Sequence, residues 1–292
     1  MLFSIIIPTY NRAHLVIKTI YSALNQLEKS FEIIVVDDGS RDQTGEQVKL
    51  LNESKVRYFK ITNRERGAAR NFGALKAKGD YLYFLDSDDI VYENHLNEAK
   101  KFIELNSPPI FFQQYEIIKH DGSVHSIYKP KQNRVNNELV KRGNFMSCHG
   151  VFIQRKLFLE NQFNEDRRLS GSEDYELWLR MAARFPIYYS PKVTSALIEH
   201  ENRSVLGMDK NQLIKRKELM LEYIFQDKPF LDKYGRYKSQ LQSDAYSYIS
   251  LHSVLSGDKQ IGIKYFFKAV LKKTSFLFSK RSFSIIYRLF RF

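Results

Sequence analysis

Strand and helix signals alternate through the first third of this chain, and that alternation limits the possible folds more than any other feature. Four short segments are apolar and rich in β-branched or aromatic residues, as in strands buried within a sheet: residues 3–8, 31–38, 56–61 and 81–86. Three intervening segments have helical spacing or small helix-forming residues: 12–26, 42–54 and 66–78. This order predicts an α/β fold with a mostly parallel sheet flanked by helices.

The rest of the chain is less regular. Residues 108–130 indicate two strands around a turn at "HDGS", and residues 171–186 predict a helix with Ser172 as its N-cap. The pattern is mainly helical from about residue 205. We therefore expect two parts, an α/β domain at 1–205 and a basic helical C-terminal region at 206–292.

The charge balance predicts an anionic partner. The chain has 46 Lys and Arg against 33 Asp and Glu, a net charge of +13, which suits a nucleic acid, a phosphorylated ligand or an anionic membrane surface. A single cysteine, Cys148, indicates a reducing compartment and a buried apolar role. No leader peptide and no membrane-spanning stretch is evident, so we expect a cytoplasmic location.

Polar residues follow three of the predicted strands. They occupy residues 8–12, residues 37–40 and the cluster Asp86, Asp88 and Asp89. Ligands of open α/β sheets bind outside the carboxyl ends of the strands, so these three loops point to one crevice. Like charges as close as those of the Asp cluster repel one another, which favours a bound cation.

Each motif has a chemical and a structural interpretation. The Asp86-x-Asp88 pair suits a divalent ion that also binds phosphate oxygens, although the same residues suit a turn or helix N-cap. Asp38 could accept hydrogen bonds from a nucleobase or ribose, or serve the Asp-Gly turn. Arg70 could pair with a diphosphate, or lie solvated on its helix.

Two further motifs stand later in the chain. Adjacent Glu173 and Asp174 could supply a general base toward a hydroxyl, or simply stabilise a helix N-terminus. His200 could be a metal ligand, or an ordinary surface or core histidine.

Taken in order, these motifs resemble family 2 glycosyltransferases of the GT-A fold, of the type that builds bacterial surface polysaccharides. The matching segments are "SIIIPTYNR", "EIIVVDDGSRDQT", "RGAARNFGALKAKGDYLYFLDSDD", "GSEDYELWLR" and "HENRS", which cover roughly residues 1–205. The family commonly has Asn-x-Gly before the Ala-Arg-Asn element, whereas this chain has "NRERGAARN". We therefore assign no role to residues 63–66.

The resemblance implies an inverting transfer of sugar from a nucleotide-diphosphate sugar, with UDP as the default nucleotide, to a saccharide or lipid-linked acceptor. By position, the resemblance implies that Asp38 contacts the base, that Asp86 lies near the ribose and that Arg70 lies near the nucleotide. The residues that would line the nucleotide are Pro8, Thr9, Tyr10 and Arg12. It further implies that Asp88, the second Asp of the DXD motif, coordinates Mg²⁺ or Mn²⁺, and that His200 completes the metal site. Asp174 would be the catalytic base, beside Glu173.

The C-terminal region lies outside the resemblance. Residues 256–292 contain nine Lys or Arg and one Asp, interleaved with aromatic residues in helical spacing. This composition suits peripheral binding to the inner face of an anionic cell membrane, but equally helices packed on the catalytic domain.

Two rival functions stay open for the chain. A nucleotidyltransferase would release pyrophosphate instead of nucleoside diphosphate. A basic nucleic-acid-binding protein is disfavoured because the charge is concentrated late in the chain, so we expect no nucleic acid partner.

Overall fold

A computed structural model describes residues 1–200 and 210–290 of the chain. Its centre is a seven-stranded sheet, the main sheet, in the order β10-β6-β9-β4-β1-β2-β3. All neighbouring strands are parallel except β9, which runs antiparallel to β4 and β6. The strands are β1 (Phe3–Thr9), β2 (Phe31–Asp37), β3 (Val56–Lys60), β4 (Tyr81–Phe84), β6 (Ile110–Gln113), β9 (Val151–Gln154) and β10 (Ile187–Ser190).

A smaller sheet lies beside the main one. It has the order β5-β11-β7-β8 and contains β5 (Ile90–Val91), β7 (Glu116–Ile118), β8 (Val124–Ser126) and β11 (Ser195–Ile198). The hairpin β7–β8 turns at "HDGS", as the sequence predicts. The same segment holds a third strand, however, because β6 separates from β7 and joins the main sheet. The prediction of two strands in residues 108–130 was therefore wrong.

Both faces of the main sheet are buried, which explains the uninterrupted apolar runs. Along β1 the side chains alternate, so Ile6 belongs to one apolar cluster and Ile5 and Ile7 to the other. The second cluster is covered by α1 (Ala13–Leu24) and α4 (His95–Asn106). The first is covered by α3 (Glu65–Lys76), α6 (Arg155–Glu160) and α7 (Glu173–Arg184).

The remaining helices of the sheet region are shorter. They are α2 (Thr44–Leu50), α5 (Asn136–Arg142) and the 3₁₀ turns η1 (Cys148–Gly150) and η2 (Arg167–Leu169). Helix α7 begins where predicted and Ser172 is its N-cap residue, but the Ser172 side chain makes no capping hydrogen bond. Its Oγ instead lies 3.2 Å from Lys217 Nζ. Cys148 is buried, as expected.

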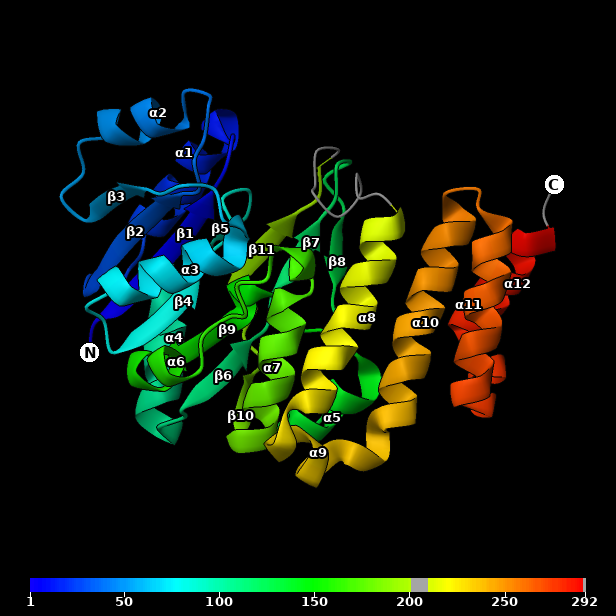
Figure 1. The fold of residues 1–292 in the computed structure, drawn as a ribbon. Coiled ribbons are helices and arrows are strands. Elements are labelled where there is room, and N and C mark those ends of the chain that lie inside the picture. Colours follow the sequence, from blue (N-terminus) through cyan, green and yellow to red (C-terminus); the bar gives the residue numbers. More distant parts are fainter. Residues whose placement is uncertain (201–209, 291–292) are drawn as a thin grey trace.

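The described part of the C-terminal region is helical. It consists of α8 (Lys210–Gln226), α9 (Lys228–Tyr234), η3 (Gly235–Tyr237), α10 (Lys238–Leu255), α11 (Lys259–Lys272), η4 (Thr274–Phe278) and α12 (Lys280–Phe290). Helices α7, α8, α10 and α11 stand side by side, and α11 and α12 form the end of the molecule far from β2 and β3 (Figure 1). Apolar residues of α8 to α10 belong to the same cluster as α7. The division of the chain near residue 205 stays a prediction, and that position lies outside the described residues.

Among the described residues, no helix combines the length and the apolar character needed to cross a membrane.

Candidate active site

A cleft of about 530 Å³ opens at the carboxyl ends of β1, β2 and β4, within the size range of small-molecule sites. Its walls come from the three polar loops that the sequence pointed to, together with Asn63 before α3, the first two residues of α3, and one residue of η2. The lining residues are Pro8, Thr9, Tyr10, Asn11, Arg12, Asp38, Asn63, Glu65, Arg66, Asp86, Ser87, Asp88 and Arg167. The convergence expected from parallel topology is therefore present.

Asp38 organises the loop that closes one side of the cleft. Its carboxylate accepts hydrogen bonds from the backbone N–H groups of Arg64 (2.7 Å) and Glu65 (2.9 Å), and from the Asn63 amide (3.0 Å). Burial raises the pKa of Asp38, and these backbone hydrogen bonds oppose the rise. This loop is the one that departs from the family pattern, and Glu65 occupies it with a left-handed φ of 73°.

The three carboxylates after β4 have separate partners. Asp86 accepts from Arg70, and Asp88 Oδ2 lies 3.0 Å from His200 Nε2 and 3.9 Å from Arg12. Asp89 is buried, accepts from the backbone N–H of Ile198, and lies 3.3 Å from His149. The cluster is tolerated because each acid faces a different group, and Asp89 is a structural tie to β11.

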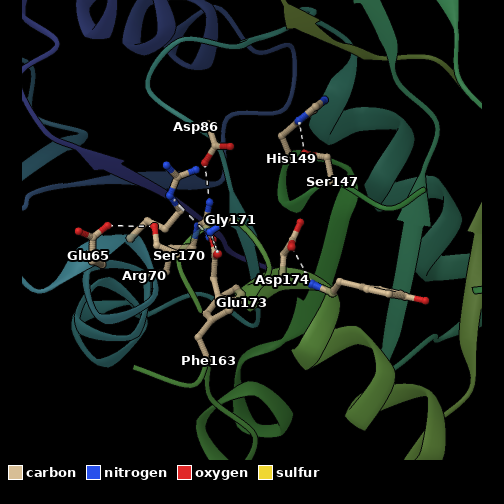
Figure 2. A network of polar contacts seen from close by, with 12 residues as sticks. Glu65, Arg70, Asp86, Ser147, His149, Phe163, Ser170, Gly171, Glu173 and Asp174 are labelled. Atoms are coloured by element: carbon tan, nitrogen blue, oxygen red, sulfur yellow. Dashed lines mark hydrogen bonds and ion pairs between the residues drawn. The ribbon is translucent and has the colours of Figure 1, made fainter. Parts of the chain in front are cut away.

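Arg70 joins the cleft to the start of α7. It is buried, and its two terminal nitrogens donate to Asp86 (2.7 Å) and Glu173 (2.8 Å), as Figure 2 shows. Burial alone would raise the pKa of both acids. The charges of Arg70 and Arg66 outweigh it, so the pKa of Asp86 falls to about 2 and that of Glu173 also falls. Asp86 and Glu173 therefore stay charged, and both are paired with Arg70.

Asp174 differs from its neighbour. It lies apart from the Arg70 network (Figure 2), and its side chain accepts from Asn144 at 3.1 Å and from its own helix backbone. Burial and the adjacent Glu173 charge raise the pKa of Asp174 to about 6. A carboxylate with a raised pKa is suited to take a proton near neutral pH, so the prediction of Asp174 as the general base is consistent with its surroundings.

The predicted site residues fall into two groups. Those that line the cleft are Pro8, Thr9, Tyr10, Arg12, Asp38, Asp86 and Asp88. Arg70, Glu173, Asp174 and His200 are not lining residues. Arg70 contacts the lining residue Asp86 and also binds Glu173, whereas His200 contacts the lining residue Asp88.

Sequence analysis missed Asn63, Glu65, Arg66 and Arg167, which also line the cleft. Charge in "NRER" was the available signal for the first three. Arg167 is brought near by the fold, where its guanidinium donates to Asn63 (2.6 Å) and Glu65 (3.4 Å). The "ENRS" part of the last motif lies outside the described residues.

The residues at the cleft edge fit a divalent ion held jointly with a nucleotide. Asp88 and His200 offer one oxygen and one nitrogen 3.0 Å apart. No group of three or more potential metal-binding side chains occurs within residues 1–200 and 210–290. Protein ligands alone are therefore too few for a preformed cage, whereas Mg²⁺ and Mn²⁺ often take their remaining positions from phosphate and water.

Residues 4–162 match the family model described as "Glycosyl transferase family 2". An uncharacterized glycosyltransferase of Rickettsia felis is 32% identical over 243 residues, which are 82% of this chain and 39% of that protein. The Escherichia coli protein named UDP-Glc:alpha-D-GlcNAc-diphosphoundecaprenol beta-1,3-glucosyltransferase WfgD is 34% identical over 61% of this chain and 68% of its own length.

Among solved structures, residues 1–349 of S. aureus TarS, crystallised with UDP-GlcNAc, align with a TM-score of 0.67 and 17% identity. The alignment covers 94% of this chain and 91% of that one. This similarity confirms the predicted GT-A fold. The chain spans between about a quarter and two thirds of the length of the first curated relatives it matches.

Proposed function

This chain belongs to glycosyl transferase family 2, and on that premise we propose that it transfers a sugar from a nucleotide-diphosphate sugar to an acceptor hydroxyl. The observation that carries the proposal is the division of charge at the site. The cleft is lined by Arg12, Arg66 and Arg167, which suit a diphosphate, and Asp174 stands just beyond it with a pKa of about 6.

The reaction would be a single displacement. Asp174 takes the proton of the acceptor hydroxyl while the hydroxyl oxygen attacks the anomeric carbon, and the bond to the nucleoside diphosphate breaks on the opposite side. The anomeric configuration is thereby inverted. Arg70 holds Glu173 and Asp86 in place at 2.8 and 2.7 Å, which fixes the N-terminus of α7 and with it the position of Asp174.

UDP is the proposed nucleotide, and polysaccharide or glycolipid synthesis the proposed context. The name of WfgD specifies UDP-glucose and a lipid diphosphate acceptor for that protein, and TarS was crystallised with UDP-GlcNAc. Asp38 and the loop 63–66 enclose the part of the cleft suited to a nucleobase.

Metal dependence is part of the proposal. Asp88 and His200 would hold Mg²⁺ or Mn²⁺, which neutralises charge on the departing diphosphate when bound. Because these are only two protein ligands, the ion and the nucleotide should bind together.

Thermal melting with UDP, GDP, CDP and ADP, each with and without Mn²⁺, tests both the choice of UDP and the dependence on the metal ion. We expect one nucleotide, UDP, to raise the melting temperature in a Mn²⁺-dependent way, since a ligand of the folded state stabilises it by mass action. Asp88→Ala should lose this shift. An unchanged melting temperature with every nucleotide would contradict the proposal. Release of pyrophosphate in place of nucleoside diphosphate would favour nucleotidyl transfer.

The C-terminal helices are proposed to contact an anionic membrane surface. Their inner faces form a small core of Val254, Phe266, Ala269, Phe276 and Ile285. In α12, Ile285 is buried in this core, and Ile286 and Leu289 are partly buried against it. Their outer faces still carry exposed large apolar side chains: Ile263, Phe267, Leu271, Leu277, Phe278, Phe283, Tyr287 and Phe290.

Cations accompany these apolar side chains. Lys264, Lys272, Lys280, Arg281 and Arg288 are exposed on the same helices. Lys268 is half-buried between the Tyr265 ring (4.5 Å) and Glu218 (3.8 Å). Exposed aromatic residues among lysines and arginines suit the interface of a bilayer that carries negative lipids.

A further inference from the structure

Two cationic side chains of α8 lie against the N-terminus of α7. Arg216 donates to the backbone carbonyl of Ser170 at 3.2 Å, and Lys217 Nζ lies 3.2 Å from Ser172 Oγ. Ser170 and Ser172 lie within three residues before the Glu173–Asp174 pair. The C-terminal region therefore places positive charge beside the proposed catalytic base, which the sequence motifs did not indicate.

Neither cation has an anionic partner among the described residues. No carboxylate of residues 1–200 or 210–290 lies within ion-pair distance of Arg216 or Lys217. Arg216 is only 2% exposed, and its Nε–H is buried without a hydrogen-bond partner. Burial lowers the pKa of Arg216, and the charges of Glu173 and Asp174 oppose this from beyond ion-pair distance. Burying a guanidinium with so little compensation is costly, and an anion bound beside it would offset that cost.

The surroundings reinforce the positive charge. Arg281 of α12 donates to Ser247 on α10 at 2.9 Å, and its charge acts on Lys217 from a third helix. Lys217 also lies 4.7 Å from the centre of the Tyr248 ring. Burial, followed by the Arg216 charge, lowers the pKa of Lys217 to about 8, while Asp174 acts in the opposite direction. A bound anion would offset both the burial of the Lys217 charge and its repulsion by Arg216.

The position of Arg216 and Lys217 indicates which kind of anion they would bind. Neither Arg216 nor Lys217 is among the residues that line the cleft, where Arg12, Arg66 and Arg167 supply the cations proposed for the donor diphosphate. Both contact the segment just before Asp174, through Ser170 and Ser172, and in the proposed reaction the acceptor hydroxyl reaches Asp174. We propose that Arg216 and Lys217 form a binding site for a phosphate or diphosphate group carried by the acceptor, close to the sugar whose hydroxyl Asp174 deprotonates.

This inference rests on the proposed function and narrows its substrate class to phosphorylated acceptors, such as a sugar joined to a lipid through a diphosphate. Guanidinium and ammonium groups are the usual partners of phosphate oxygens. The donor also carries a diphosphate, so the same chemistry could come from either substrate, and the experiment has to separate the two.

Inorganic pyrophosphate is the probe. Its binding to the full chain is measured by titration calorimetry with UDP and Mn²⁺ in excess, so that the cleft is already filled. We expect pyrophosphate to bind this complex, and Lys217→Gln to weaken that binding about tenfold or more, because a charge-assisted contact is lost. The matched control is Lys215→Gln, which removes the same charge from an exposed position on α8 and should leave the affinity unchanged.

A second measurement assigns the anion to its substrate. UDP affinity should be the same in wild type and Lys217→Gln, whereas transfer to a diphosphate-bearing acceptor should fall relative to transfer to the same sugar as an alkyl glycoside. Lys217→Arg should restore much of the preference. Thermal melting confirms that each variant is folded.

Two outcomes would overturn the inference, and a third would instead contradict the proposed function. Failure of pyrophosphate to bind the UDP complex would remove the site. A loss of UDP affinity in Lys217→Gln would assign the cations to the donor instead. Failure of UDP to bind wild type would contradict the proposed function. Pyrophosphate binding without UDP, compared between Lys217→Gln and Lys215→Gln, would still test the cation site.

Discussion

Two neighbouring carboxylates at the start of α7 acquire different ionisation because only one of them has a close cation partner. Glu173 is paired with Arg70 at 2.8 Å, whereas Asp174 accepts from the neutral Asn144 amide. The result is a lowered pKa for Glu173 and a pKa of about 6 for Asp174. A difference of this kind is a usual basis for assigning acid and base roles.

Asp174→Asn should abolish most sugar transfer and leave UDP binding intact, because Asp174 does not line the cleft. A general base contributes about 10²–10⁴-fold to rate, and we expect a loss in that range. In wild type, kcat/KM should rise tenfold per pH unit below pH about 6 and level off above it, since the base acts unprotonated. A pH–rate profile and a UDP titration measure both. Full activity of the variant would contradict the assignment.

Stability gives an independent check on the same residue. Because its pKa is raised above the ordinary value of 3.8, the folded protein binds this proton more tightly than the unfolded chain does. The free energy of unfolding therefore falls as pH rises from about 4 through about 6. Asp174→Asn should remove this part of the pH dependence and melt no lower than wild type above pH 6.

Glu65 presents a different kind of local conflict, between side chain and backbone. Its φ of 73° is a left-handed conformation that favours glycine, and its N–H is held by Asp38 at 2.9 Å. The family pattern of Asn-x-Gly places a glycine two residues after the asparagine, which is the position of Glu65 after Asn63. The backbone form is thus present although the glycine is not.

Comparing Glu65→Gly with Glu65→Ala isolates that conflict, because both variants lose the contacts to Arg167 and Ser170. The glycine variant should be more stable by about 1 kcal/mol, since a Cβ disfavours the left-handed region. Urea unfolding measures the difference. Equal stability of the two variants would show that the loop relaxes to another conformation.

At the scale of elements, helix α3 lies close against the main sheet because its facing residues are small. A Cβ on Gly73 would come within 2.5 Å of the Ile6 side chain and 3.2 Å of Val36. Helix α3 also carries Arg70. The distance between α3 and β1 therefore fixes the position of the Arg70 guanidinium between Asp86 and Glu173. Small residues in "RGAARNFGALK" therefore serve the site through packing.

Gly73→Val should destabilise the fold by about 1–3 kcal/mol, the usual cost of overpacking a core. It should also weaken UDP binding, because α3 would move away from the sheet and displace Arg70. Gly235→Ala is the control, since a Cβ there meets no atom within 4 Å. Denaturant unfolding and UDP titration of both variants measure the effects. A fully stable Gly73→Val would contradict the close packing.

At the scale of the whole molecule, the distribution of exposed aromatic residues is uneven. The exposed phenylalanines of the described residues, Phe267, Phe278, Phe283 and Phe290, all lie on η4, α11 and α12 at one end of the molecule (Figure 1). Large exposed apolar groups that gather in one region mark a binding surface. Their position away from the cleft leaves the active site open.

Wild type should float with vesicles that contain phosphatidylglycerol at low salt, and Phe267→Ser with Phe283→Ser should reduce the bound fraction several-fold. Added salt should weaken binding because it screens the lysines and arginines. Leu50→Ser with Leu105→Ser is the matched control, since these side chains are 82% and 83% exposed on α2 and α4. Equal flotation of the Phe267 and Phe283 variant would refute the proposed surface.

The sequence alone determined the order of elements in the first third and the loops that form the cleft. Apolar runs predicted β1 to β4, and parallel topology places the carboxyl ends of β1, β2 and β4 at one edge, so Asp38, Asp86 and Asp88 had to converge. These conclusions depend on local composition and on a general rule of connection. They needed no contact between distant segments.

Only the tertiary structure decided how the acids differ and which distant cations face them. Arg70 pairs with Glu173, 103 residues away along the chain, and not with the adjacent Asp174. Arg167 reaches the cleft from η2, and Arg216 and Lys217 reach the base from α8. Ionisation and charge pairing depend on distance and burial in three dimensions, which residue type and spacing along the chain do not specify.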